Sequence, residues 1–385
     1  MYSANYFGSY ELCIWNNSDT FSWQDRSFGD VWARNSIGLD TGFWVYALFH
    51  RLIVYRTLCT QTQGQRWLVL LSNQFVPYFA EDVYDNHQGE GYALITPEPM
   101  GNFKFDHRKL EWVGDFSKLG ECAQKSWFGV IVGLDDEDLA KESEMLMQFR
   151  FLGTRPINIT DYYEMKWQKI PVYFLKKSWF VFSEGFRLFH NPVGLRLKRM
   201  CDFIGALILL VLLSPIMILT WLLVIIDSPG PAIFRQVRTG QNGKDFVIYK
   251  FRSMKVDAEK DGVQWSKKGD SRITRVGKFI RKTRLDELPQ ILNVIRGEMS
   301  FIGPRPELPQ FNRKLEKEIP HYQLRHLLKP GVSGWAQVMY PYGASTKDST
   351  EKLKYELFYI KNYSIYLDLI IIFKTIRVIL GGKGR

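Results

Sequence analysis

Two adjacent carboxylates, Asp286 and Glu287, lie in a part of the chain that is otherwise rich in lysine and arginine. Carboxylate oxygens are the ligands that Mg²⁺ prefers, and a carboxylate can also attack phosphorus to form an acyl phosphate. One carboxylate of the pair could therefore hold Mg²⁺ while the other serves as a nucleophile. A structural alternative exists, because acidic residues are also ordinary capping residues at the start of a helix.

The residues after the acidic pair predict a helix. Apolar side chains recur there at helical spacing: Leu288, Ile291, Leu292 and Ile295. Pro289 suits a first turn, and Gly297 suits a stop. The pair is therefore expected at a helix N-terminus, where free N–H groups and the helix dipole favour carboxylates and bound phosphates.

Four basic residues are candidates for binding substrate phosphates: Lys250, Arg252, Arg281 and Arg305. Lys250 and Arg252 end a strand-like run, and Arg281 lies shortly before the acidic pair. Arg305 lies between two prolines, and its planar guanidinium matches phosphate oxygens. Cations in such positions would neutralise charge on a transferred phosphoryl group.

The charge of the chain is unevenly distributed. Its 385 residues allow two domains and include 51 Lys and Arg against 40 Asp and Glu. The positive excess lies after residue 190, whereas the N-terminal half is net acidic, so an anionic partner is expected for the C-terminal half. Nucleic acid is disfavoured as that partner, because the acidic pair would repel a phosphate backbone.

The cysteines and the N-terminus argue against a disulfide-rich protein, a zinc protein and a protein with a cleavable signal peptide. The four cysteines are far apart, which argues against a disulfide framework or a zinc site and favours a reducing compartment. The first 30 residues show no basic stretch followed by an apolar core, so no cleavable signal peptide is expected.

One apolar segment, Phe203–Ile226, is long enough to cross a bilayer. Ser214 and Pro215 lie at its middle, where proline predicts a sharp bend. Both flanks are basic, which places both ends on the cytoplasmic side. A re-entrant hairpin over residues 199–226, broken at Ser214-Pro215, is therefore favoured over a single span. A later apolar helix, Tyr363–Leu380, is expected to contact the membrane interface.

The N-terminal half predicts an α/β domain over residues 61–180, after an unassigned segment 1–60. The alternation of patterns indicates a parallel sheet. The expected strands are Trp67–Leu71, Tyr92–Ile95, Phe128–Val132 and Pro156–Ile159, and the expected helices are Val76–Tyr84 and Asp135–Phe149. The turn after the first strand has no glycine, so cofactor binding is disfavoured. Phe43–Tyr55 is too short to span a membrane and is interpreted as a core or interfacial helix, and residues 181–195 are interpreted as a connector.

From about residue 190 onward the chain resembles the bacterial sugar transferases, the monotopic polyprenyl-phosphate glycosyl-1-phosphate transferases of exopolysaccharide synthesis. The resemblance rests on several ordered stretches: Ser214-Pro215, Gln236–Gly240, Lys250–Met254, Leu285–Gln290, Met299–Pro306, Lys329–Val338 and Tyr359–Ser364. The N-terminal half resembles the diverged α/β domain of the long members, and the four-helix membrane bundle usual at their start is not expected here.

This resemblance implies a diverged Rossmann-like α/β domain, followed over residues 196–385 by a mostly helical α+β monotopic membrane catalytic domain with a re-entrant helix hairpin. It implies transfer of a sugar-1-phosphate from a UDP-sugar to undecaprenyl phosphate, with release of UMP, at the start of exopolysaccharide, capsule or O-antigen synthesis. Asp286 would carry the phosphosugar and Glu287 would hold Mg²⁺, while Lys250, Arg281 and Arg305 would contact phosphates. The expected location is the bacterial inner membrane, with catalysis on the cytoplasmic face.

Two other classes remain open on the sequence alone. One is a protein that binds nucleic acid or anionic lipid without catalysis, and the other is a single-span membrane protein with a cofactor-dependent α/β domain. The donor sugar and the formation of a homo-oligomer are not decided by the sequence.

Overall fold

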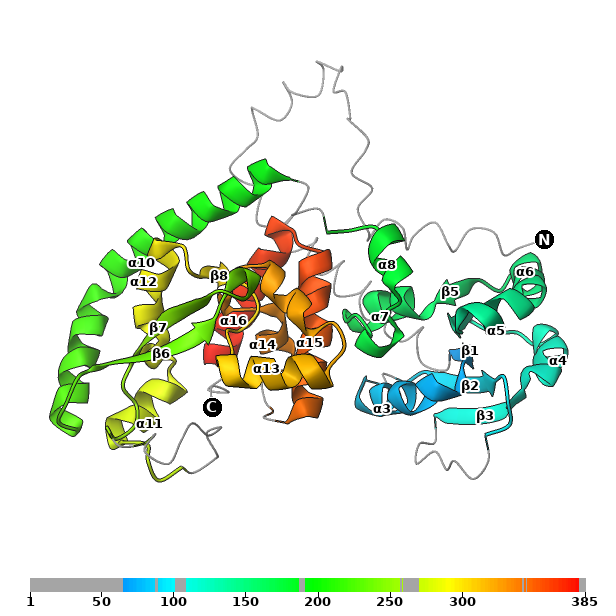
Figure 1. Ribbon diagram of the computed structural model, residues 1–385, viewed down its shortest axis with the longest axis horizontal. Coiled ribbons are helices and arrows are strands. Elements are labelled where there is room, and N and C mark those ends of the chain that lie inside the picture. The colour runs from blue at the N-terminus through cyan, green and yellow to red at the C-terminus, as the bar shows by residue number, and fades with distance from the viewer. Residues whose placement is uncertain are drawn as a thin grey trace, which may run out of the picture. The chain divides into compact units, whose positions relative to one another are not determined.

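The computed structural model describes residues 65–86, 89–100, 109–186, 191–256, 258, 270–340, 343 and 345–380. Nearly all of the described residues belong to one compact unit, Arg66–Arg385. The segment expected to be unassigned, 1–60, and its apolar stretch Phe43–Tyr55 lie outside them. Figure 1 shows the arrangement of the elements.

A five-stranded, all-parallel sheet forms the N-terminal part of this unit, which confirms the predicted parallel α/β sheet. Its strands lie in the order β3-β2-β1-β4-β5. They span Arg66–Leu71 (β1), Gly91–Thr96 (β2), Leu110–Asp115 (β3), Gly129–Gly133 (β4) and Pro156–Asn158 (β5). The central strands β1 and β2 are buried at almost every position, which explains their continuous apolar sequence.

Helices cover both faces of this sheet. They span Val76–Asn86 (α3), Leu119–Ala123 (α4), Asp136–Lys141 (α5), Ser143–Phe151 (α6) and Ile159–Trp167 (α7). The next helix, Lys177–Phe182 (α8), packs through Trp179 and Phe180 against the core of the C-terminal part instead. Alternate residues of β1 pack into two separate cores: Trp67 and Val69 face α3 and α7, and Leu68 and Leu70 face α4 and α6. The sheet is therefore sandwiched between two helical layers.

Two local predictions for this region were wrong. The helix predicted over Asp135–Phe149 is two helices, because the backbone at Glu142 leaves the helical region between α5 and α6. Asp135 caps α5 with its side chain, and Leu139, which was expected on the apolar face, is exposed. The strand β3 was missed because this edge strand alternates only weakly between buried and exposed positions.

The C-terminal part is mostly helical, as predicted, and contains two small sheets. Strands β6 (Ile233–Thr239) and β7 (Asp245–Phe251) form an antiparallel hairpin, and β8 (Ser300–Ile302) pairs in parallel with β9 (Gly331–Ser333). The helices are Arg275–Lys282 (α11), Ile291–Arg296 (α12), Pro309–Glu318 (α13), Trp335–Met339 (α14), Thr346–Lys361 (α15) and Ile365–Leu380 (α16). Short 3-10 helices span Leu285–Gln290 and Tyr322–Leu327.

The long apolar segment is a single helix, α10 (Pro192–Asp227), of 36 residues. Among the described residues it is the one helix long and apolar enough to cross a membrane. The predicted break at Ser214-Pro215 is not seen, because Pro215 lies inside a continuous helix. Proline removes the hydrogen bond to the carbonyl four residues earlier, and the hydroxyl of Ser214 donates to that carbonyl, Val211, at 2.8 Å. The helix still bends along its length (Figure 1).

The N-terminal end of α10 is fixed to the core that carries the acidic pair. The guanidinium of Arg199 donates to the carbonyls of Val294 and Ile295 at 2.5 and 2.7 Å, which satisfies the open end of α12. Asp202 is buried and accepts a hydrogen bond from the backbone of Phe301. These bonds tie α10 to the segments that follow the acidic pair.

Three glycines allow two loops to cross in direct backbone contact next to β8 and β9. A Cβ atom at Gly331 would lie 2.1 Å from the nitrogen of Gly303. A Cβ atom at Gly303 would lie 2.3 Å from the carbonyl of Lys329, and one at Gly334 would lie 2.2 Å from the carbonyl of Gly303. The crossing therefore requires glycine for space, and it fixes the loop that leads to Arg305.

We expect Gly331→Ala to lower the stability of the protein by about 1–3 kcal/mol, because the added methyl group would overlap backbone atoms that cannot move freely. Thermal unfolding of the purified protein in detergent measures this. Gly120→Ala, in α4, is the matched control, since a Cβ atom there meets nothing within 4 Å. Equal melting temperatures for the two variants would contradict the crossing as described.

Candidate active site

The acidic pair lies in the first turn of the 3-10 helix Leu285–Gln290, which runs directly into α12. This confirms the predicted position at a helix start. The residue before this helix, Arg284, adopts the left-handed conformation with φ of 61°. Such a backbone is unusual for a residue other than glycine and often marks a functional site. The turn places Asp286 and Glu287 in different surroundings.

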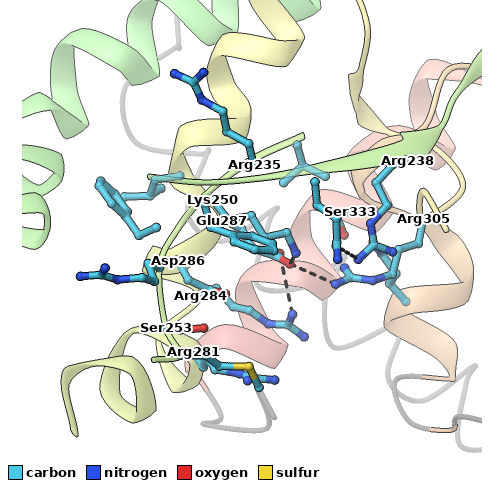
Figure 2. Close-up of a pocket in the computed structure, with 18 of the residues that line it drawn as sticks. Arg235, Arg238, Lys250, Ser253, Arg281, Arg284, Asp286, Glu287, Arg305 and Ser333 are labelled. Atoms are coloured by element: carbon cyan, nitrogen blue, oxygen red, sulfur yellow. Dashed lines mark hydrogen bonds and ion pairs between the residues drawn. The ribbon is translucent and has the colours of Figure 1, made fainter. Parts of the chain in front are cut away.

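Glu287 is the centre of a buried ion-pair cluster (Figure 2). Its Oε1 atom lies 3.0 Å from Nζ of Lys250 and 3.1 Å from Nη2 of Arg305. Its Oε2 atom lies 3.7 Å from Nη1 of Arg284. Burial alone would raise the pKa of Glu287, but Lys250, Arg305 and Arg284 outweigh burial and hold this pKa well below its ordinary value.

Asp286 makes no such pair. Its Oδ1 atom is buried and has no hydrogen-bond partner among the described residues. Burial, and then the negative charge of Glu287, raise the pKa of Asp286 to about 6, against the opposing effect of Lys250, Arg284 and Arg281. Neighbouring acids with separated pKa values are typical of sites in which each acid has its own role.

The structure brings together most of the predicted phosphate-binding residues. Lys250, Arg281 and Arg305 line one cavity together with both acids. Arg252 also lines it, but its two terminal nitrogens donate to the carbonyls of Ser228 and Pro229, just after α10. Arg252 therefore holds the turn that follows α10, and its predicted contact with phosphate stays a prediction.

The cavity is also lined by arginines that were not among the predicted ligands, and two of them, Arg284 and Arg238, lie close to its acidic residues. Arg284 contacts Glu287, and only its position next to the acidic pair could have indicated this. Arg238, on β6, lines the same cavity and lies 3.8 Å from Glu307. The antiparallel register of β6 and β7 brings Arg238 to this place, and that pairing could not be derived from the residue types alone.

The cavity has a volume of about 1180 Å³ and joins two chemically different walls. One wall carries the acids and the cations. The other carries apolar side chains of the long helix α10: Leu209, Leu213, Trp221 and Ile225. Thr375 and Val378 of α16 also line the cavity. A ligand with a charged head and an apolar chain would match both walls.

The donor set fits a metal ion that is shared with a substrate, and it does not fit a cage made by the protein alone. Among the described residues there is no group of three or more His, Cys, Asp or Glu side chains able to hold a metal. The unpartnered Oδ1 atom of Asp286 and the carboxylate of Glu287 are hard oxygen donors. Mg²⁺ commonly uses one or two carboxylates together with substrate phosphates and water.

Comparison with known proteins identifies the family of this site. A sequence model described as "Bacterial sugar transferase" matches residues 193–382. An N-acetylgalactosaminephosphotransferase of Aeromonas hydrophila, named as acting with UDP-N-acetylgalactosamine and undecaprenyl phosphate, is 38% identical over 357 residues. That match covers 89% of this chain and 78% of the relative.

Other relatives match the C-terminal part. A UDP-glucose:undecaprenyl-phosphate glucose-1-phosphate transferase of Klebsiella pneumoniae is 45% identical over 188 residues, covering 48% of this chain and 40% of the relative. A putative undecaprenyl-phosphate N-acetylgalactosaminyl 1-phosphate transferase of Bacillus subtilis is 51% identical over 131 residues, covering 34% of this chain and 73% of the relative. The family model and these relatives show that the chain is a transferase and belongs to the bacterial sugar transferase family, and the basic cavity with its acidic pair agrees with this.

Proposed function

We propose that this protein transfers a sugar-1-phosphate from a UDP-sugar to undecaprenyl phosphate, giving undecaprenyl-diphosphate-sugar and UMP, as the first step of exopolysaccharide, capsule or O-antigen synthesis. The observation that carries the proposal is the separation of the two acids. Glu287 is held ionised by three cations, whereas Asp286 is unpaired in the same cavity. The relatives are named for transfer to undecaprenyl phosphate, which agrees with this chemistry.

In the donor step, an oxygen of Asp286 attacks the β-phosphorus of the UDP-sugar. The bond from that phosphorus to the bridging oxygen breaks, UMP leaves, and an aspartyl-phosphosugar remains. Lys250, Arg284 and Arg305 already lie around Glu287 and are placed to neutralise the diphosphate and the departing UMP. Arg281 lines the same cavity and adds to this positive field.

In the acceptor step, a phosphate oxygen of undecaprenyl phosphate attacks the same phosphorus. The phosphorus–carboxylate bond breaks, which regenerates Asp286 and completes the diphosphate-linked lipid. The apolar wall supplied by α10 supports this step, because it lies in the cavity that holds the acids. The prenyl chain can stay among apolar side chains while its phosphate reaches Asp286.

Glu287 is the residue that would hold Mg²⁺, with the remaining ligands from the diphosphate and water. The metal would screen the negative charge of the phosphates. Lys250, Arg284 and Arg305 could then move from the carboxylate of Glu287 to the phosphate oxygens. Their present contacts with Glu287 keep them close to that position.

Asp286→Asn is expected to abolish UMP release, because the amide cannot form the acyl phosphate. The variant should stay folded, because it replaces a carboxylate whose charged form burial disfavours. Incubation of the wild-type protein with Mg²⁺ and a UDP-sugar radiolabelled in the sugar, without acceptor, should leave label on Asp286. A panel of UDP-glucose, UDP-galactose and UDP-N-acetylgalactosamine would identify the donor. Substantial turnover by the Asn variant would rule out the covalent route.

The raised pKa of Asp286 predicts a pH dependence of the donor step. The carboxylate must be ionised to attack, so kcat/KM for the UDP-sugar should fall as the pH decreases through about 6. The pKa of Glu287 lies well below its ordinary value, so this residue should not titrate in the same range. UMP release measured between about pH 5 and about pH 8 tests this. A flat profile through pH 6 would contradict the assignment of Asp286.

We also propose a monotopic inner-membrane location, with α10 re-entrant and catalysis on the cytoplasmic face. Basic residues at both ends of α10 and the bend along the length of this helix support this. The helix α16 adds a second apolar surface, with Ile365, Tyr366, Leu369 and Phe373 exposed.

The strand order β3-β2-β1-β4-β5 supports a diverged Rossmann-like origin for the α/β domain.

Single cysteines at positions 195 and 231, on either side of the apolar segment, test the path of α10. In a variant whose four native cysteines are replaced by serine, both positions should react with a membrane-impermeant maleimide only in inverted membrane vesicles. The two ends then lie on the cytoplasmic side. Reaction of the two positions from opposite sides would show a single span.

A further inference from the structure

We propose that the α/β domain positions the donor-site residue Arg305 through helix α15, so that the α/β domain and the C-terminal part together determine the geometry of the donor site. The inference rests on the proposed function and assigns a role to the α/β domain. The coupling consists of two buried ionic contacts on opposite faces of α15. One contact is made with the α/β domain and the other with the loop of Arg305.

The first contact is a buried cluster between α3 and α15. Nζ of Lys354 lies 2.6 Å from Oδ1 of Asp82 and also bonds Glu351. Nζ of Lys169, in the α/β domain, lies 2.7 Å from Glu351. The hydroxyl of Tyr163 donates to Asp82 at 2.7 Å. The four charged side chains are at most 5% exposed and balance each other in charge, so removal of one leaves an uncompensated buried charge.

The backbone strengthens this contact. The carbonyl of Lys354 accepts a hydrogen bond of 3.0 Å from the N–H of Ile170. The indole of Trp335, in α14, donates to the carbonyl of Gln168 at 3.2 Å. Gln168 adopts the left-handed conformation at the end of α7, with φ of 53°. The neighbour of Trp335, Ala336, lines the cavity, so the α/β domain also contacts a helix of the cavity wall.

The second contact joins α15 to the donor site. Glu356 accepts two hydrogen bonds from Arg325, from Nε at 2.9 Å and from Nη2 at 2.8 Å. The same Nη2 atom donates to the backbone carbonyl of Arg305 at 2.8 Å. Nη2 of Arg305 in turn lies 3.1 Å from Glu287. Arg325 and Glu356 are both buried, so they are positioning residues that act through Arg305.

Helical geometry explains how one helix serves both contacts. Lys354 and Glu356 are two residues apart, which is about 200° of rotation and places them on opposite faces of α15. Nearly every residue of this helix from Thr350 to Lys361 is buried. A shift of α15 toward or away from the α/β domain must therefore move Glu356, and with it the carbonyl of Arg305. The path from Asp82 to Glu287 therefore runs through helix α15 and through the hydrogen bonds and ion pairs at its two ends.

The test uses a double variant, Asp82→Asn with Lys354→Met, in the full-length protein. It removes one charge of each sign, so the remaining pair of Lys169 and Glu351 stays neutral. We expect KM for the UDP-sugar to rise roughly threefold to thirtyfold with kcat changed by less than about twofold. A purely structural role would instead lower the active fraction, and thus kcat, at unchanged KM.

The matched control is Glu81→Gln with Lys347→Met. These residues form an ion pair between the same two helices, α3 and α15, but both side chains are about half exposed. Exposed pairs contribute little, so KM should stay at the wild-type value. Equal KM values for the wild type, the double variant and the control would overturn the inference.

Hydrogen–deuterium exchange of the substrate-free protein gives a readout that does not depend on catalysis. Exchange over residues 303–307 should increase in the double variant and stay unchanged in the control. If the wild-type protein releases no UMP from any UDP-sugar, the proposed function fails, and exchange alone decides the coupling. If the double variant does not fold, Lys354→Arg, which keeps the charge, is compared with Lys347→Arg. Unchanged exchange in Lys354→Arg then overturns the inference.

Discussion

The site depends on one constraint, which is that the buried carboxylate of Glu287 must be neutralised by the protein itself. Lys250, Arg284 and Arg305 come from a strand, a left-handed turn and a proline-flanked loop, and they converge on its two oxygens. A buried charge without such partners would be strongly disfavoured. The cluster therefore links three segments of the C-terminal part, whereas the Oδ1 atom of Asp286 has no hydrogen-bond partner in the described part of the chain.

Each cation reaches this position by a different structural device. The hairpin of β6 and β7 carries Lys250, and the backbone of Arg284 adopts a conformation that is costly for a residue with a side chain. The loop of Arg305 is fixed by the glycine crossing at Gly303 and Gly331 and by the buried guanidinium of Arg325. Such over-determination is expected where the geometry of a site must be kept against strain.

The sequence predicted the chemistry better than the geometry. The residue types at Asp286, Glu287, Lys250 and Arg305 were sufficient to propose phosphate chemistry, because hard oxygen donors and cations have few other uses in such a pattern. The parallel sheet also followed from its buried strands. The ion-pair cluster at Glu287 could not be predicted in this way. Lys250 is far from Glu287 in the sequence, and the two side chains meet because β7 packs against the 3-10 helix Leu285–Gln290. Nor did the periodicity indicate that α10 continues through Pro215, where the hydroxyl of Ser214 bonds the carbonyl that proline leaves free.

The cavity wall contributed by α10 has a consequence for how the concentrations of the two proposed substrates are expressed. Leu209, Leu213, Trp221 and Ile225 belong to a helix whose remaining surface is largely exposed and apolar. For an acceptor that arrives alongside this helix, the relevant concentration is its mole fraction within the bilayer, whereas the nucleotide donor is counted per volume of water. The rate would then respond to dilution of the acceptor by other lipids in the plane of the membrane, even at constant bulk concentration. Under the proposed function, the reaction rate would thus depend on the lipid composition of the membrane.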